Sequence, residues 1–481
     1  MPARAFAPCA TTPFDYPPPL RALCAAAVFV TFAGLVTLRG PASPGSMGAL
    51  LALLGMVLAA TELRLLRDDV QLTALFLVLP LYHVLNMAWT GWDPALLDKP
   101  GRLVFGLFVY VALSRVGVGA RALRWGAIAG CITAAGLAVY QLHVLHAGRA
   151  HGVMNAIPFG NDSLLLAFLA AAGWATVPRA GRGSALTVST LIAVGAGLYA
   201  SLASGTRGGW IVIPVLAWVL SLGAGDVRRR VRPGVTAATV ALLAVAAILL
   251  AAVHDRTAAE LGAVREVLAA SPAAAATMAL SSLGARLHLY RIGIDAFLAS
   301  PLVGIGFANL AGHLAAGAEA GLINPAVTHF THLHSSVVDT LGRGGALGML
   351  ALGCFGFGFI RYFLRALATA TDCDTRYFAL VGLLAISAAL LFSLSNVLFP
   401  AIVGTNVFVM TIAVPAGALA HRVRHRTSAA FPAVDGVPAG DRGSGGSREK
   451  PPGGIRNVHF APAGAPAEAA PARLDNREVA Q

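Results

Sequence analysis

The chain has 481 residues, of which 57% are hydrophobic and only 12% are charged, and its formal net charge is +13. A soluble globular chain is about half apolar and a quarter charged, so this composition excludes an ordinary soluble domain and predicts an all-α, polytopic membrane protein. The positive charge lies in short arginine clusters between apolar blocks, without a basic stripe interleaved with aromatic residues. This distribution argues against a nucleic-acid partner.

Apolar blocks recur along the chain, and we predict twelve transmembrane helices, each judged against about 20 residues per crossing. Nine of them fall within 22–252 and three within 336–426, and a cytosolic segment at 1–21 precedes them. The predicted spans lie at about 22–38, 46–61, 72–89, 103–118, 123–145, 162–177, 185–203, 209–223, 235–252, 336–360, 377–395 and 400–420.

The loops between the spans predict the orientation, because Lys and Arg accumulate in short cytosolic loops. With the N-terminus inside, every second loop carries arginines and the alternation has no conflict. Both termini are therefore predicted to be cytosolic. The arginines of the predicted inner loops are Arg64, Arg67, Arg115, Arg121, Arg124, Arg179, Arg182, Arg228, Arg229, Arg230, Arg232, Arg361, Arg365 and Arg376.

Two long segments are not predicted to cross the membrane. The segment at 253–335 is predicted to be a long periplasmic loop, in which "SLGARLHLYRIGIDAFLASPLVGIGFANL" mixes apolar residues with arginines. This pattern predicts a helix that lies at the membrane interface and ends at the turn formed by Ser300 and Pro301. The segment at 427–481 is rich in Gly, Pro, Ala and charge, which predicts a disordered cytosolic tail.

Cations on the predicted outer side are candidates for binding an anionic ligand, since short outer loops should contain few of them. Arg207 stands in "SGTRGGW", where small neighbours let the backbone approach a ligand and the guanidinium fork suits phosphate. The competing interpretation is an arginine that reaches toward lipid phosphates. Arg286 and Arg291 are five residues apart on one predicted helix, so they point about 140° apart and one can face a cavity while the other faces headgroups. Alternatively, both belong to the wet side of an interfacial helix.

Three histidines precede the tenth predicted span: His329, His332 and His334. They fit a metal site, a catalytic base, or polar residues at the start of a helix. Carboxylates that would complete or support a metal site are sparse on the predicted outer side, where Glu319 and Asp339 are the nearest in sequence. We therefore expect no metal here.

The start of the tenth span carries a possible capping box, with Ser336 as the N-cap and Asp339 as its fourth residue. His334 would then stand just before the helix, where the helix dipole disfavours a positive imidazolium. A neutral imidazole can accept a proton, and backbone N–H groups at the same helix start can bind an anion. A general base and an anion site can therefore share one place, and the alternative is a water-exposed histidine at the interface.

The sequence around His334 resembles the O-antigen ligase family, bacterial inner-membrane enzymes related to O-antigen polymerases and to protein O-oligosaccharyltransferases. The family signature is a His, then Asn, Ser or Gln, then nine residues, then Gly-x-x-Gly. Here His334 and Ser335 are followed by nine residues and by Gly345 and Gly348, although Met349 stands where many ligases have Thr or Tyr. "ARLHLYRIGIDAFLASPLVGIGFANL" and "SGTRGGW" resemble further segments of the family. The spacing singles out His334 and leaves His332 as an ordinary polar residue.

The resemblance implies a GT-C-like glycosyltransferase of the inner membrane, whose active site faces the periplasm. The donor would be a polysaccharide on undecaprenyl pyrophosphate, and the acceptor a sugar hydroxyl of the lipid A-core. The reaction would be inverting and metal-independent, without a cofactor. His334 would be the general base, while Arg207 and Arg286, or Arg291 in place of Arg286, would bind the pyrophosphate. Further candidates for substrate binding are Lys99, Arg102, Arg149, Ser335 and Asp339, the last of which would also orient His334.

Three other functions compete with the ligase. An O-antigen polymerase uses the same donor with another lipid-linked glycan as acceptor, but the Gly-x-x-Gly spacing after His334 favours a ligase. Enzymes that transfer a glycan to a protein hydroxyl generally carry a larger soluble outer region than 253–335. A secondary transporter would place ionisable residues near the membrane midplane, whereas the predicted spans contain almost no acids.

Overall fold

The computed structural model describes residues 16–61, 69–206, 208–223, 282–397 and 402–430, together with Arg265, Ala269 and Ala274. Every regular element within these ranges is helical, which confirms the predicted all-α fold for the part of the chain that is described. The predicted ninth span at 235–252, the first part of the long loop and nearly all of the predicted tail lie outside the described residues.

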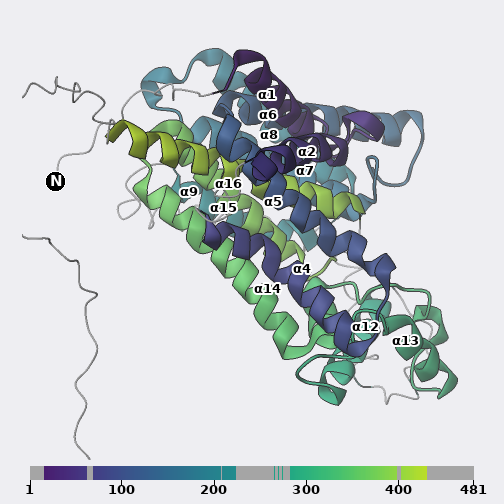
Figure 1. Cartoon of the computed structure of the whole chain (residues 1–481). Coiled ribbons are helices and arrows are strands. Elements are labelled where there is room, and N and C mark those ends of the chain that lie inside the picture. Colours follow the sequence, from purple (N-terminus) through teal and green to yellow (C-terminus); the bar gives the residue numbers. More distant parts are fainter. Residues whose placement is uncertain are drawn as a thin grey trace, which may run out of the picture. The chain divides into compact units, whose positions relative to one another are not determined.

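The helices follow the chain as a bundle with a second group of helices at one end (Figure 1). In the bundle, α5 packs against α2 and α16, α7 against α8, and α1 against α6. The N-terminal helices are α1 (Pro18–Ala33), α2 (Pro44–Thr61), α4 (Val70–Thr90), α5 (Asp98–Val116), α6 (Ala120–Val139) with the π-helical turn η3 (Tyr140–Val144), α7 (Ala156–Ala175), α8 (Ser184–Ala203) and α9 (Ile213–Leu222). The C-terminal helices are α12 (Ser282–Ala299), α13 (Leu310–Glu319), α14 (Ser336–Thr369), α15 (Cys373–Phe392) and α16 (Ile402–Ala430). Short 3-10 turns are η1 (Gly40–Ala42), η2 (Pro94–Leu97), η4 (Arg179–Gly181), η5 (Gly208–Val212) and η6 (Pro325–Val327).

Eight of the described helices are long and apolar enough to cross a membrane, and each corresponds to one of the twelve predicted spans. They are α2, α4, α6 with η3, α7, α8, α14, α15 and α16. Three further predicted spans coincide with α1, with α5 and with η5 and α9 together. Of these, α1 and the last pair are short, and α5 carries charged residues toward its ends.

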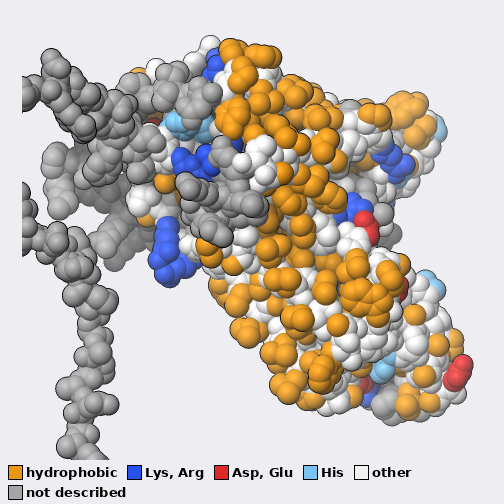
Figure 2. Space-filling view, in the orientation of Figure 1, with side chains coloured by type: hydrophobic (Ala, Val, Ile, Leu, Met, Phe, Trp, Pro, Cys, Tyr) orange, Lys and Arg blue, Asp and Glu red, His pale blue; other side chains and the backbone are white. Residues whose placement is uncertain are grey.

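The surface of the bundle is unusually apolar. Figure 2 shows hydrophobic side chains gathered over the face that carries α4 and α14. Among them Leu85 of α4 is 66% exposed and Phe357 of α14 is 74% exposed. Large apolar side chains are unfavourable in water over so wide an area, so this face fits contact with lipid chains.

Polar contacts at the two ends of α15 show that neighbouring helices run antiparallel. At its start, Arg422 of α16 pairs with Asp372 at 3.1 Å and with Asp374 at 2.7 Å. At its end, the backbone N–H of Ser336 donates to the carbonyl of Ser393 at 2.9 Å. The turn that carries His334 and the connection after α15 therefore lie at the same end of the bundle.

The helix α14 is interrupted at Gly345, which has φ 61° and ψ −161°. The segment after α12 fits into this break: the N–H of Ala346 donates to the carbonyl of Pro301 at 2.8 Å, and the N–H of Ile305 donates to the carbonyl of Gly342 at 3.0 Å. A Cβ at Gly345 would come within 2.5 Å of the backbone of Leu302. The glycine-rich part of α14 around Gly345 and the segment from Pro301 to Gly306 therefore pack together as one packing unit. Each of the two donates hydrogen bonds to the other.

Candidate functional site

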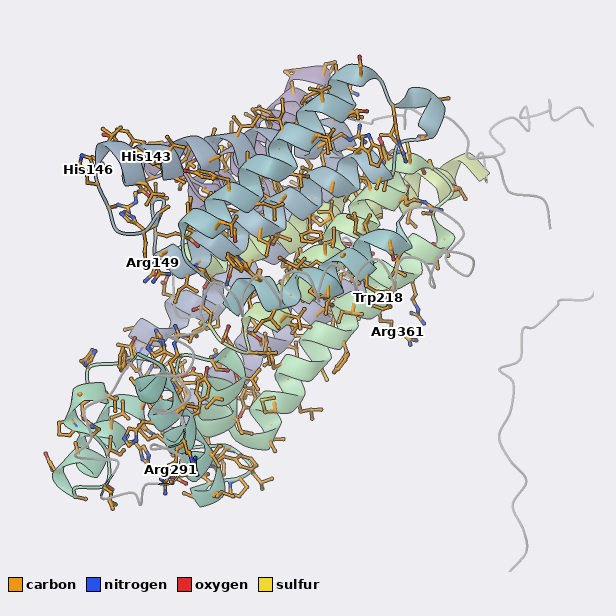
Figure 3. The ribbon with its side chains drawn as sticks, turned by 180° about the vertical axis from the view of Figure 1, so that it is seen from behind. His143, His146, Arg149, Trp218, Arg291 and Arg361 are labelled. Carbon is orange, nitrogen blue, oxygen red and sulfur yellow. The ribbon has the colours of Figure 1, made fainter. Side chains whose placement is uncertain are left out.

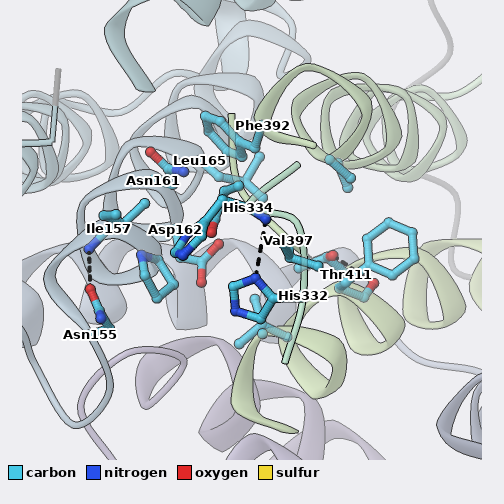
Figure 4. A pocket seen from close by; sticks show the side chains of 17 residues that line it. Asn155, Ile157, Asn161, Asp162, Leu165, His332, His334, Phe392, Val397 and Thr411 are labelled. Atoms are coloured by element: carbon cyan, nitrogen blue, oxygen red, sulfur yellow. Dashed lines mark hydrogen bonds between the residues drawn. The ribbon is translucent and has the colours of Figure 1, made fainter. Parts of the chain in front are cut away.

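A cavity of about 180 Å³ lies between α7, α15, α16 and the turn that precedes α14. Its apolar walls come mainly from α15 and α16. Its polar lining comes mainly from the first turns of α7 and from the turn before α14 (Figure 4). The polar residues that line it are Asn155, Asn161, Asp162, His332, His334, Asn396 and Thr411.

His334 stands in this cavity with a left-handed backbone, at φ 54°. Such a φ is uncommon for a residue other than glycine and costs about 1–2 kcal/mol, so the surroundings must hold it. The N–H of Leu333 donates to Asp339 Oδ1 at 3.1 Å, and Ser335 Oγ donates to the carbonyl of Ser393 at 3.1 Å. The ring of His334 meets that of Phe330 edge-on, with 4.6 Å between centroids. These contacts fix the histidine from both sides.

The pKa of His334 is lowered from its ordinary value of 6.5 to about 4. Burial is the largest cause, and the side chains of His332, Arg286 and His329 add to it, because each disfavours a further positive charge nearby. The ring is therefore unprotonated at neutral pH and can accept a proton. The helix dipole predicted this neutrality from the sequence, whereas its first cause in the structure is burial.

Of the two arginines of α12, Arg286 lies within electrostatic reach of His334. Arg291 instead lines a separate cavity between α12 and α13, together with His288, Asp295 and His313 (Figure 3). The two side chains therefore have different surroundings, and Arg286 is the one that lies near His334.

A family model described as O-antigen ligase matches residues 191–353. This segment belongs to the O-antigen ligase family. It contains α12, α13, the turn with His334 and the interrupted first part of α14. Members of the family are membrane glycosyltransferase-like ligases and polymerases, and this match, together with the eight apolar helices, supports a multi-pass membrane enzyme of this general kind. No curated protein matches the chain.

Arg207, which was predicted to bind the pyrophosphate together with Arg286, lies outside the described residues. Its neighbours on both sides pack against the start of α7. Thr206 Oγ1 donates to the carbonyl of Ala156 at 2.9 Å, and a Cβ at Gly209 would come within 2.2 Å of Asn161 Oδ1. Thr206 and Gly209 therefore lie beside the helix that supplies the polar wall of the cavity.

Neither Arg149 nor Arg102 lines the cavity. Arg149 is exposed, and its Nε donates to the carbonyl of Ser204 at 2.7 Å, close to the "SGTRGGW" segment (Figure 3). Arg102 forms an ion pair with Asp98 at 2.9 Å and donates to Asn406 Oδ1 at 2.8 Å. It lines a different cavity, between α2, α5 and α16. The side chain of Lys99 lies outside the described residues.

The predicted capping box is wrong by one residue. Ser335, not Ser336, is the N-cap of α14, because its Oγ accepts from the N–H of Val338 at 3.3 Å. Asp339 does not reach back to the cap; its carboxylate accepts from Leu333 and pairs with Arg343 at 3.1 Å. Asp339 therefore acts on the backbone just before His334.

Asp162 is a cavity residue that was not predicted from the sequence. It is the first residue of the predicted span at 162–177, whereas α7 begins at Ala156 because Asn155 Oδ1 caps it by accepting from the N–H of Ile157 at 3.0 Å. Asp162 thus lies inside an apolar helix and lines the cavity of His334. An ionisable residue in such a helix is itself a signal of function, and the adjacent pair Asn161 and Asp162 offered that signal.

The three histidines before α14 were also considered as metal ligands. Their rings cluster, with 4.6 Å between the centroids of His332 and His334. Within the described ranges, no three His, Cys, Asp or Glu side chains come together in a way that could hold a metal ion.

Proposed function

We propose that the chain is an O-antigen ligase of lipopolysaccharide biosynthesis. It transfers a polysaccharide from undecaprenyl pyrophosphate to a sugar hydroxyl of the lipid A-core at the periplasmic face of the inner membrane. The observation that supports this most directly is the neutral His334, which lines a cavity within reach of Arg286. An unprotonated base and a permanent cation beside it are the two groups that such a transfer requires.

The chemistry follows from these two groups. His334 takes the proton of the acceptor hydroxyl while the hydroxyl oxygen attacks the anomeric carbon of the donor sugar. The bond from that carbon to the pyrophosphate oxygen breaks, and undecaprenyl pyrophosphate leaves with the electron pair. Attack from the face opposite the leaving group inverts the anomeric centre. General-base assistance of this kind is typically worth about 10²–10⁴-fold in rate.

In this proposal the guanidinium groups bind the pyrophosphate and neutralise the charge that develops on it. Arg286 does so from α12, together with Arg207. Arg207→Lys tests its part, because lysine keeps the charge but loses the planar fork. A strong loss of transfer is expected, and full activity in this variant would assign Arg207 to lipid anchoring instead.

Transfer by the purified protein tests the base. His334→Ala should still bind the lipid-linked donor but should no longer transfer the polymer. His143→Ala is the matched control, because His143 is exposed on η3 and outside the cavity (Figure 3). Transfer by His334→Ala at the wild-type rate would show that His334 is not the base. Activity that EDTA abolishes and a divalent cation restores would contradict the metal-independent mechanism implied by the family.

Deletion of the gene separates the ligase from the polymerase. Loss of long ladders in a gel of the surface glycolipid, with intact core and accumulated lipid-linked polymer, supports the ligase. Core that carries a single repeat indicates the polymerase. Unchanged glycolipid would exclude both.

A further inference from the structure

The cavity that holds His334 contains a carboxylate that the proposed mechanism does not use. Asp162 lies in the second turn of α7, is half-buried and lines the cavity. It has no hydrogen bond or ion pair with any other residue that the structure describes. A carboxylate held in an apolar helix without a partner is unfavourable by itself, so its place in the cavity points to a ligand that supplies hydrogen-bond donors.

The neighbouring side chain is an independent sign of the same site. Asn161 also lines the cavity and is only 4% exposed. Its Oδ1 is buried and has no hydrogen-bond partner among the described residues. A buried amide oxygen without a partner costs about 1–3 kcal/mol, and proteins rarely keep one without a reason. Gly209 leaves room for this amide, because a Cβ there would come within 2.2 Å of Oδ1.

The chemistry of the pair selects a sugar over a phosphate. A carboxyl group exchanges hydrogen bonds with hydroxyl groups, and its charged form repels the anionic pyrophosphate, which Arg286 attracts from the side of α12. The amide of Asn161 can accept from one hydroxyl and donate to another. Phe392 of α15, in the wall of the same cavity, offers an apolar face for the C–H groups of a sugar ring. The part of the cavity near α7 is therefore suited to a neutral polyol, whereas Arg286, which does not line the cavity, attracts the anionic pyrophosphate toward the turn of His334.

We propose that Asp162 and Asn161 form a subsite that binds hydroxyl groups of the acceptor sugar and so holds the attacking hydroxyl at His334. This inference rests on the proposed transferase function. The acceptor is favoured over the first sugar of the donor, because that sugar is tied to the pyrophosphate and therefore to the arginines. The acceptor must also reach His334, which lines the same cavity as both residues.

Steady-state transfer by the purified full-length protein tests the subsite, with donor and acceptor varied separately. Asp162→Asn keeps the shape of the side chain and loses its charge, and Asn161→Ala removes the amide. Each should raise the KM for the acceptor about tenfold or more, while the KM for the donor stays as in the wild type. Thr176→Val is the matched control at the end of the same helix: Thr176 lies outside the cavity, and its hydroxyl donates to the carbonyl of Ala172 at 2.8 Å. This variant should leave both KM values unchanged.

Other outcomes overturn the inference. A rise in the donor KM alone would assign the subsite to the donor sugar. A fall in kcat at unchanged KM would mean that Asp162 handles the proton. Unchanged kinetics in both variants, with melting temperatures as in the wild type, would show that no subsite exists.

If the wild-type protein transfers nothing, the proposed function fails first. The subsite is then tested by calorimetric binding of delipidated core oligosaccharide to the wild-type protein and to Asp162→Asn. Equal affinity, or no binding to either protein, would reject it.

Discussion

The backbone N–H of His334 donates a hydrogen bond to Nδ1 of His332 at 3.2 Å. A neutral imidazole that accepts at Nδ1 carries its proton at Nε2, so this bond fixes the tautomer of His332. The same bond supports the left-handed backbone of His334. His332 is therefore a positioning residue for the proposed base, although its place in the sequence suggested only an ordinary polar side chain.

Substitution of His332 should separate this positioning role from a general structural one. His332→Ala removes the acceptor for the N–H of His334, and we expect kcat to fall about fivefold to tenfold, which corresponds to the loss of one hydrogen bond. In His332→Asn, the amide oxygen can take the place of Nδ1 and should restore most of the rate. The measurement is kcat at saturating donor and acceptor. Equal rates in His332→Ala and the wild type would show that the bond does not position His334.

The acid limb of the pH profile should report the lowered pKa of His334. Because the base works only when unprotonated, transfer should stay at its plateau at neutral pH and fall as the pH drops toward about 4. Arg286→Gln removes one of the positive charges that lower this pKa, so the limb should move to higher pH, while Arg286→Lys should keep it in place. The measurement is kcat/KM for the acceptor against pH. Arg291→Gln is the control, and a limb that moves equally in both Gln variants would contradict the placement of Arg286.

The sequence predicted the parts of the site that depend on local spacing. His334 follows from its distance to Gly345 and Gly348, and the structure shows why that distance matters, since α14 opens at Gly345 to receive the segment around Pro301. The spacing of Arg286 and Arg291 predicted that their environments would differ. Which of them faces His334 could not be predicted, because it depends on how α12 packs against α14.

Asp162 shows what local patterns leave out. Hydropathy located a span near this residue but could not place its start, which the cap by Asn155 determines. The side of α7 that faces the cavity depends on the packing of α7 against α15, two helices about 200 residues apart in the chain. The acidic residues near His334 in the sequence therefore do not include the one that lines the same cavity.

The buried ion pair of Asp339 and Arg343 should be important for stability. Arg343 is 6% exposed, and its Nη1 lies 3.1 Å from Asp339 Oδ2. Asp339→Asn keeps an acceptor for the N–H of Leu333 but leaves the arginine charge buried without its partner, which should cost about 3–5 kcal/mol. The double variant Asp339→Asn with Arg343→Met removes that charge and should recover part of the loss. Melting of the detergent-purified proteins measures both, and a single variant as stable as the wild type would show that the pair adds nothing.

Substitution of Gly345 should disrupt the packing unit that carries the turn of His334. In Gly345→Ala, the residue keeps a φ of 61° only at a cost of about 1–2 kcal/mol, and its Cβ would lie 2.5 Å from the backbone of Leu302. Relief of this clash requires the segment at 301–304 to move away and to lose its hydrogen bonds to Ala346 and Leu347. We expect a lower melting temperature together with a loss of transfer. Gly353→Ala is the matched control on the same helix, because a Cβ there meets no atom within 4 Å. That control should melt at or slightly above the wild-type temperature, since alanine favours a helix over glycine. If the two variants behave alike, the break at Gly345 is not required for the site.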